Sequence, residues 1–341
     1  MAEFDDSRLE DPAALVRADD LLRRLAGAGA RVRIEAEKSA GPIASLEPSK
    51  PRAIIAVGSE ARLVRAMLEP TSPVPFVAWP RHGLPGWVGP LDLVVVMAPE
   101  GGSPDLVATV HEAVRRGCAV LIACPPASTI AEYAGSRATT LLPAGSGDTL
   151  AVAVQMLSAL HRLHLGPEAD PLRVADAMDQ IAENCSPHVD LAVNPAKDLA
   201  LAMADAQPLV WGGSVLAARA ARRVAEALRA ASGRPALAAD SGELEIVMDA
   251  VGARDPFADP FEQAAADRRP VLLILDDGTG DDAVHVARNR LLAKAESRDV
   301  RVCQIRHHDG SELERYASLL QTGWFAAAYL EVGLDDGLDR R

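Results

Sequence analysis

The sequence predicts an α/β protein of two domains, each a parallel sheet flanked by helices in a flavodoxin-like three-layer sandwich. The first observation is the segment from Asp92 to Cys124, where two apolar runs, 93–97 and 119–123, flank a helical pattern. Such unbroken runs are typical of strands buried on both faces of a parallel sheet. The second is that strand, glycine turn and helix return in residues 208–231 and 270–306. Two similar halves explain 341 residues better than one large sheet.

The elements of the first half follow from the same patterns. Ser103 and Pro104 stand at the cap and first position of the helix after Met97, and Gly117 ends that helix. The other predicted elements are an amphipathic helix over 9–25, a connection with one short strand over 26–50, a strand and helix over 53–68, a strand over 74–79, a short helix near 127–133, a strand over 138–142 and a long helix over 149–165.

The second half begins after a polar segment rich in Asp, Glu, Asn and Pro. We expect a first domain over 1–165 that includes the N-terminal helix, a helical linker over 166–194 centred on 174–183, and a second domain over 195–341. The final helix, 311–332, is expected to be broken or bent near Gly323, because glycine is a poor helix former.

Charge and composition exclude several classes of protein. There are 48 acidic against 35 basic residues, a formal charge of −13, which argues against nucleic acid or an anionic membrane as the main partner. The N-terminus lacks the apolar core of a signal peptide, and no run approaches the roughly 18 apolar residues that span a membrane. The four cysteines lack metal-ligand spacing and are interpreted as reduced core residues. We therefore expect a cytoplasmic protein.

Glycine–serine turns are the first candidate binding sites. Gly58-Ser59 and Gly213-Ser214 each lie between a strand and a helix, where free N–H groups and the helix dipole favour phosphate. Similar turns occur at Gly101-Gly102-Ser103, 145–147 and 278–280. The alternative is purely structural, since any strand-to-helix turn favours these residues. No turn fits a Walker loop or a full dinucleotide fingerprint, so a nucleotide-binding domain is not indicated.

Two strings and the order of elements resemble a known family. The strings are NPAKDLALAMADAQPLVWGG, residues 194–213, and LLQTGWFAAAYLEVGLD, residues 319–335. Together with the segment 92–124, they make the chain resemble, from about residue 50 onward, a double sugar isomerase (SIS) domain protein of the bifunctional phosphoglucose/phosphomannose isomerase type.

The resemblance implies a substrate and a chemistry. Such enzymes convert glucose 6-phosphate or mannose 6-phosphate to fructose 6-phosphate through an enediolate, without metal or other cofactor. Glu226 falls at the place of the carboxylate that carries the proton between C1 and C2. The alternative is an exposed helix glutamate beside Arg222 and Arg223. Gly58, Ser59, Gly101, Gly102, Ser103 and Ser214 would hold the sugar phosphate. A homodimer is expected, because the family's site forms where two chains meet.

The chain departs from the family pattern at three places. The loop 98–105 keeps one serine, lacks a threonine and adds Glu100, whose charge repels phosphate. Asp148-Thr149 stands where the family has a cationic Pro-Arg pair. The string 241–251 lacks the family's ring-opening histidine, although Glu243 and Glu245 remain.

The histidines and aspartates elsewhere leave alternatives open. His307 and His308 follow a predicted strand and could face a cleft, or simply be solvated. Asp276, Asp277, Asp281 and Asp282 suggest a metal, but capping of a strand end and helix start explains them, so no metal site is expected.

Two functions remain. The first is a hexose 6-phosphate isomerase with Glu226, Glu243 and His308 as catalytic candidates. The second is a non-catalytic SIS protein that binds a sugar phosphate as a sensor or regulator.

Overall fold

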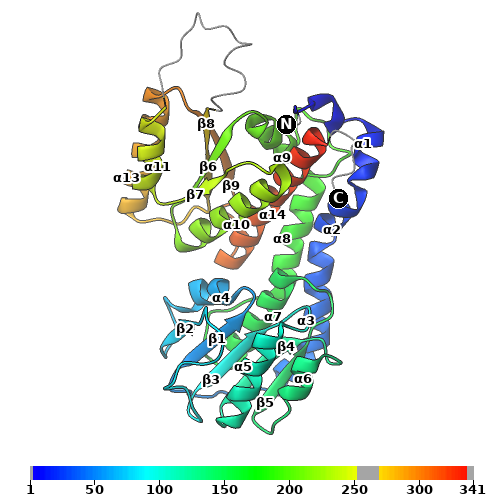
Figure 1. The fold of residues 1–341 in the computed structure, drawn as a ribbon, viewed down its shortest axis with the longest axis vertical. Coiled ribbons are helices and arrows are strands. Elements are labelled where there is room, and N and C mark those ends of the chain that lie inside the picture. Colours follow the sequence, from blue (N-terminus) through cyan, green and yellow to red (C-terminus); the bar gives the residue numbers. More distant parts are fainter. Residues whose placement is uncertain (1–2, 252–268, 336–341) are drawn as a thin grey trace, which may run out of the picture. The chain divides into compact units, whose positions relative to one another are not determined.

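Two compact units make up the chain in a computed structural model, which describes residues 3–251 and 269–335 (Figure 1). One unit is residues 28–176, and the other joins residues 1–27 to residues 177–341. Each has one parallel sheet flanked by helices, which confirms the predicted fold class. The division differs from the predicted domains, because the first 27 residues pack with the second unit and the boundary falls inside helix α8 (Pro171–Asn184).

The unit 28–176 holds a five-stranded sheet in the order β2-β1-β3-β4-β5, with every strand parallel. Its elements before α8 are α3 (Ala28–Ala44), β1 (Ile54–Gly58), α4 (Ala61–Leu68), β2 (Phe76–Ala78), β3 (Leu93–Met97), α5 (Pro104–Arg115), β4 (Ala119–Cys124), α6 (Thr129–Tyr133), β5 (Thr139–Pro143) and α7 (Thr149–Arg162).

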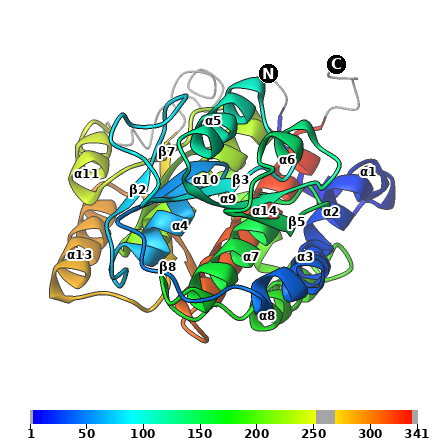
Figure 2. The same ribbon diagram turned by 90° about the horizontal axis from the view of Figure 1, so that it is seen from below.

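Helices cover both faces of this sheet. Helices α5 and α6 lie on one face, and α3, α4 and α7 on the other (Figure 2). Alternate residues of the strands therefore face different layers: Ile55, Val94 and Val120 pack with Val110 of α5. Every residue of β3 is buried, as its unbroken apolar run predicted.

The prediction of a connection with a short strand over 26–50 is wrong, because residues 28–44 form helix α3. The buried face of α3 carries Val32, Glu35 and Ser39, which recur at helical spacing. Two of these three residues are polar, so an apolar helical stripe was absent from the sequence. The face packs on α7 and β5.

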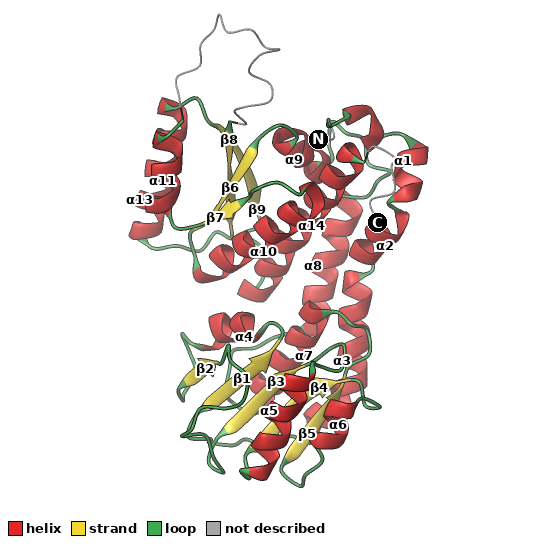
Figure 3. Ribbon diagram, viewed as in Figure 1, coloured by secondary structure: helices red, strands yellow, loops and turns green. Residues whose placement is uncertain are grey.

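The second unit holds a four-stranded parallel sheet in the order β7-β6-β8-β9 (Figure 3). Its elements are η1 (Asp6–Leu9), α1 (Pro12–Arg17), α2 (Asp19–Ala26), the end of α8, α9 (Pro195–Met203), β6 (Gln207–Gly212), α10 (Val215–Ser232), β7 (Leu237–Ala238), α11 (Ser241–Asp249), β8 (Pro270–Asp276), α13 (Asp282–Ser297), β9 (Arg301–Arg306) and α14 (Glu312–Leu334).

The two faces of this sheet are also covered. Helices α11 and α13 pack on one face, where Leu244 and Leu291 meet Leu272. Helices α10 and α14 cover the other. Helix α14 runs unbroken through Gly323, so the predicted break is wrong. Glycine is needed there for close packing instead, because a Cβ atom would lie 2.3 Å from Cγ2 of Val224 on α10.

The N-terminal segment is three short helices rather than the single helix predicted over 9–25. Asp11 caps α1, and because this helix ends at Arg17 the predicted helix is interrupted there. The segment lies along α14: Asp5 N–H donates to the Gly333 carbonyl (2.9 Å), and Gln321 Nε2 donates to the Leu25 carbonyl (2.6 Å).

The remaining predictions about composition concern membranes and cysteines. Within residues 3–251 and 269–335, no helix combines the length and apolar character needed to cross a membrane. All four cysteines are free and buried, as predicted. Burial raises the pKa of the Cys185 thiol to about 12, so this group stays protonated at neutral pH.

Candidate functional site

The carboxyl ends of β1 and β3 meet where the strand order of the unit 28–176 reverses. After β1 the chain passes to β2 on one side, and then to β3 on the other. Open α/β sheets bind ligands at such a point, because the loops that leave two neighbouring strands diverge there. The turn after β1 and the loop Ala98–Ser103 after β3 lie at this edge.

The turn after β1 is held against the end of β3. Gly58 has a φ of +91°, and a Cβ atom on it would lie 2.2 Å from the Met97 carbonyl oxygen, so only glycine fits. Ser59 donates to that same carbonyl from its backbone N–H (3.1 Å) and its hydroxyl (3.3 Å). This close approach fixes the Ser59 hydroxyl beside the loop that follows β3.

The loop after β3 depends on two glycines and a cap. Gly101 and Gly102 have φ values of +91° and +77°, in the left-handed region that favours glycine. Ser103 caps α5, its hydroxyl accepting from the Leu106 N–H (3.3 Å), and Pro104 takes the first helical position. The predicted cap of this helix is thereby confirmed.

A pocket of about 390 Å³ opens between these two loops, and we call it the hydroxyl pocket. It is lined by Ser59, Met97, Ala98, Pro99, Glu100, Gly102, Ser103, Leu106 and Thr149. The two serines predicted from separate turns, Ser59 and Ser103, thus line one pocket together with Thr149. Hydroxyls and backbone N–H groups at helix starts are suitable donors for a phosphate, whereas Glu100 adds an unfavourable charge.

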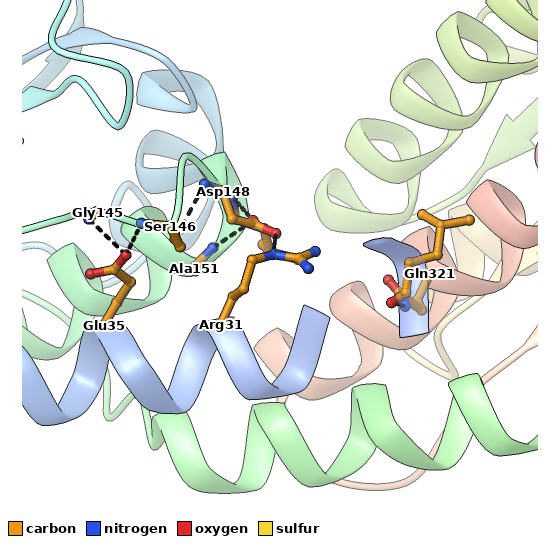
Figure 4. Close-up of polar contacts among 9 residues, drawn as sticks. Arg31, Glu35, Gly145, Ser146, Asp148, Ala151 and Gln321 are labelled. Carbon is orange, nitrogen blue, oxygen red and sulfur yellow. Dashed lines mark hydrogen bonds and ion pairs between the residues drawn. The ribbon is translucent and has the colours of Figure 1, made fainter. Parts of the chain in front are cut away.

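The turn over 145–147, also predicted to favour an anion, is filled by a carboxylate of the chain itself (Figure 4). Glu35 of α3 is fully buried and accepts from the N–H groups of Gly145 (2.9 Å) and Ser146 (2.5 Å). The turn binds an anion, as its geometry suggested, but that anion is internal. Because both N–H groups already donate to Glu35, they are not available to a bound phosphate.

Asp148 has a structural role at the start of α7. Its carboxylate accepts from the N–H groups of Leu150 (2.9 Å) and Ala151 (3.1 Å), and pairs with Arg31 at 2.8 Å (Figure 4). The carboxylate that replaces the expected cationic pair is therefore neutralised, and the adjacent Thr149 lines the hydroxyl pocket.

The second unit has a different arrangement at its carboxyl edge. The hydroxyl of Ser214, which caps α10, donates to a carboxylate oxygen of Asp277 and accepts from the Ala217 N–H at 3.0 Å. Asp277 is only 5% exposed. Ser214, predicted to hold phosphate, therefore lies beside a buried carboxylate that repels an anion.

Asp276 pairs with Arg288 (2.9 Å) and lies 3.3 Å from Nε2 of His308. Burial alone would raise the pKa of Asp276, but the Gly278 N–H, the Arg288 charge and His308 outweigh it and hold the pKa below its usual range.

The three catalytic candidates lie on different elements of the second unit. Glu226 is exposed on α10 and pairs with Arg223 at 2.8 Å. It lies twelve residues beyond Ser214, about 18 Å along the helix and away from the carboxyl edge. Glu243 is exposed in the first turn of α11, and His308 is exposed after β9. Among the described residues, no hydrogen bond or ion pair joins any two of these three side chains.

The neighbouring His307 is more enclosed than His308. Its Nε2 lies 3.1 Å from the Thr322 hydroxyl, which already donates to the Ser318 carbonyl (2.9 Å). Nε2 must then be the donor, which leaves Nδ1 as an acceptor. Burial, followed by the nearby His308 charge, lowers the pKa of His307 to about 4. This residue borders a groove of about 350 Å³ beside the edge strand β9.

The string around Asn194, which carried part of the resemblance, has a structural role. Asn194 caps α9 by accepting from the N–H groups of Ala196 (3.0 Å) and Lys197 (3.1 Å). Lys197 is 1% exposed, donates to the Pro187 (3.1 Å) and Val189 (2.9 Å) carbonyls and lies over the Tyr329 ring. Burial lowers the pKa of Lys197. These residues join α9 to α14.

Comparison with known proteins gives the fold a name. Residues 192–335 match the family profile described as the bacterial phospho-glucose isomerase C-terminal SIS domain. This part of the chain is therefore similar to a SIS domain. The match agrees with the resemblance predicted from residues 194–213 and 319–335. A search of curated protein sequences finds no match.

Solved structures extend the similarity of fold to both units. The C-terminal domain of glucosamine-fructose-6-phosphate aminotransferase from Francisella tularensis is 13% identical, with a TM-score of 0.61 over 92% of this chain and 95% of that one. Tagatose-6-phosphate ketose/aldose isomerase from Escherichia coli is 15% identical, with a TM-score of 0.59 over 96% and 92%. A glucose-6-phosphate isomerase like protein from Thermus thermophilus is 16% identical, with a TM-score of 0.52 over 92% of each. At such identities the likeness shows the fold alone.

Proposed function

We propose that the protein binds a sugar phosphate in the hydroxyl pocket and acts as a sensor or regulator rather than as an isomerase. The observation that carries this proposal is the meeting of Ser59, Ser103 and Thr149 in one pocket at the switch point of a SIS-like sheet. The hydroxyls of Ser103 and Thr149 can donate to a phosphate without a cation, and the Ser59 hydroxyl can do so by exchanging its long bond to the Met97 carbonyl (3.3 Å) for one to the ligand.

We expect no isomerase activity because of the surroundings of Glu226, the residue predicted to carry the proton. A carboxylate that moves a proton between C1 and C2 must lie within hydrogen-bond reach of the substrate. Glu226 is solvent-exposed and paired with Arg223, well away from the Ser214 end of its helix. Isomerisation by this chain remains the second candidate function, favoured by Glu243 and His308, which both lie toward the carboxyl edge of their sheet.

Calorimetric titration with glucose 6-phosphate, mannose 6-phosphate and fructose 6-phosphate tests binding. Ser59→Ala and Thr149→Val should each weaken binding about tenfold, because each removes a donor to a charged group. Ser45→Ala is the matched control, since Ser45 is exposed and its hydroxyl donates to the Pro42 carbonyl, outside the pocket. Unchanged affinity in both pocket variants would remove the hydroxyl pocket as the site.

A coupled assay of fructose 6-phosphate formation tests catalysis on the same preparations. We expect no turnover above background. Turnover that Glu226→Gln, Glu243→Gln or His308→Asn abolishes would establish the isomerase instead. The expected homodimer and cytoplasmic location remain predictions, and light scattering after size-exclusion chromatography tests the first of them.

A further inference from the structure

A second pocket adjoins the hydroxyl pocket across the loop Ala98–Ser103. We call it the ring pocket; it has a volume of about 720 Å³, against about 390 Å³ for the hydroxyl pocket. Its walls include Gly101, Val107, Ala108, His111, Ser128 and Tyr133. Glu100 and Gly102 line both pockets. Because Gly102 has no side chain, only backbone stands between the two pockets at that position.

Two aromatic rings line the ring pocket. His111 of α5 and Tyr133 of α6 meet edge to face, with ring centroids 5.3 Å apart and planes at 76°. The contact holds the Tyr133 ring in place, yet the residue is 46% exposed. An ordered aromatic ring that remains accessible can stack on a planar group at little cost in conformational entropy.

The rest of the ring pocket combines an apolar wall with a polar rim. Val107 and Ala108 present the side of α5, whereas Ser128 and Thr129 lie at the start of α6. Mostly apolar surface with a few polar groups is typical of pockets that take a ring system. No lysine or arginine lines either pocket in the described part of the chain, and the proposed function places the charged end of a ligand in the hydroxyl pocket.

The geometry points to a ligand that occupies both pockets: a phosphosugar with a planar ring at its anomeric carbon, the arrangement of a nucleoside monophosphate. The phosphate end rests on the proposed function, and the ring end rests on His111 and Tyr133 alone. A simple hexose 6-phosphate would leave the larger pocket empty. The missing Walker and dinucleotide fingerprints do not oppose this ligand, since those loops cradle chains of two or three phosphates.

Titration with adenosine 5′-monophosphate and with ribose 5-phosphate tests the inference, because the two probes differ by the planar ring. Adenosine 5′-monophosphate should bind at least about fivefold more tightly, the lower end of the effect of one base stacked on an aromatic side chain. Tyr133→Ala should abolish this difference and leave the affinity for ribose 5-phosphate unchanged. Tyr133→Phe, which keeps the ring, should retain the difference.

Trp87→Ala is the matched control, since Trp87 is also an exposed aromatic residue of this unit (49%) but lies outside both pockets. Equal affinity for the two probes, or a difference that survives Tyr133→Ala, overturns the ring pocket and leaves the proposed function standing. If neither probe nor any hexose 6-phosphate binds, the proposed function itself fails, and the inference fails with it.

Discussion

The carboxylate of Glu35 occupies the turn over residues 145–147, which the sequence predicted to bind an anionic ligand. It is the acceptor for the Gly145 and Ser146 N–H groups, and it has no access to solvent. The interaction joins residues 110 positions apart, so no local pattern could have revealed it. It also fixes the start of α7, on which Thr149 of the hydroxyl pocket lies.

Replacement of Glu35 should therefore destabilise the unit 28–176. Glu35→Ala removes the charged acceptor of two N–H groups, a loss of about 2–3 kcal/mol, which lowers the melting temperature by roughly 5–10 °C for a unit of this size. Differential scanning calorimetry measures the shift. Glu37→Ala, an exposed glutamate of the same helix, is the control and should change little. Equal effects of the two variants would contradict the role given to Glu35.

His307 makes the stability of the second unit depend on pH. Its folded-state pKa, about 4, lies below the ordinary value of 6.5, so the folded protein resists protonation that the unfolded chain accepts. The contribution of His307 to the free energy of unfolding is therefore fully present above pH 6.5, and it decreases as the pH falls from 6.5 towards 4. Asp276, whose pKa is also lowered, contributes stability that is fully present above its usual value of 3.8 and is lost only below it, so it does not change over the range in which His307 acts.

His307→Gln should flatten this dependence, because glutamine can donate to Thr322 but does not titrate. Melting temperatures between pH 7.5 and 4.5 measure the effect. The wild-type protein should lose more stability over this range than the variant does. The exposed His285→Gln is the control and should follow the wild type. Parallel curves for His307→Gln and the wild type would contradict the assignment.

At the scale of elements, the contact of α10 with α14 depends on Gly323. Any side chain there meets Val224, whose Cγ2 atom lies 2.3 Å from the Cβ position. Gly323→Ala should lower stability by about 1–3 kcal/mol through overpacking, and Val224→Ala in the same chain should restore part of the loss. Gly86→Ala, with no heavy atom within 4 Å of its Cβ position, is the control. Denaturation curves with additive single-variant effects would contradict direct contact.

The elements also show which sequence patterns were sufficient. Strands β3 and β4 were predicted nearly to the residue, because an unbroken apolar run has few other interpretations. Helix α3 was missed, because it buries Glu35 and Ser39 where an apolar stripe was sought. Ser59 and Ser103 were predicted from their turns, but Thr149 was seen only as a departure from a family pattern. The place of Thr149 in the pocket depends on contacts between loops far apart in the sequence, which no local pattern predicts.

On the scale of the whole molecule, two units with related strand orders differ at equivalent turns. In one unit the order is β2-β1-β3-β4-β5, and in the other β7-β6-β8-β9, so β1 corresponds to β6. The serine after β1 donates to a neutral carbonyl and lines a pocket, whereas the serine after β6 donates to the buried Asp277. The repeat therefore preserves the fold but not the environment that an anion requires.

This asymmetry predicts one sugar phosphate per chain rather than two. The buried carboxylate of Asp277 disfavours phosphate beside Ser214, because like charges repel strongly where solvent is excluded. Calorimetric stoichiometry should therefore be close to one, Ser59→Ala should weaken binding, and Ser214→Ala should leave it unchanged. A stoichiometry of two, with one site lost in each serine variant, would contradict the asymmetry. Higher salt should weaken the single site only modestly, since hydroxyls and backbone N–H groups, rather than cations, make its contacts.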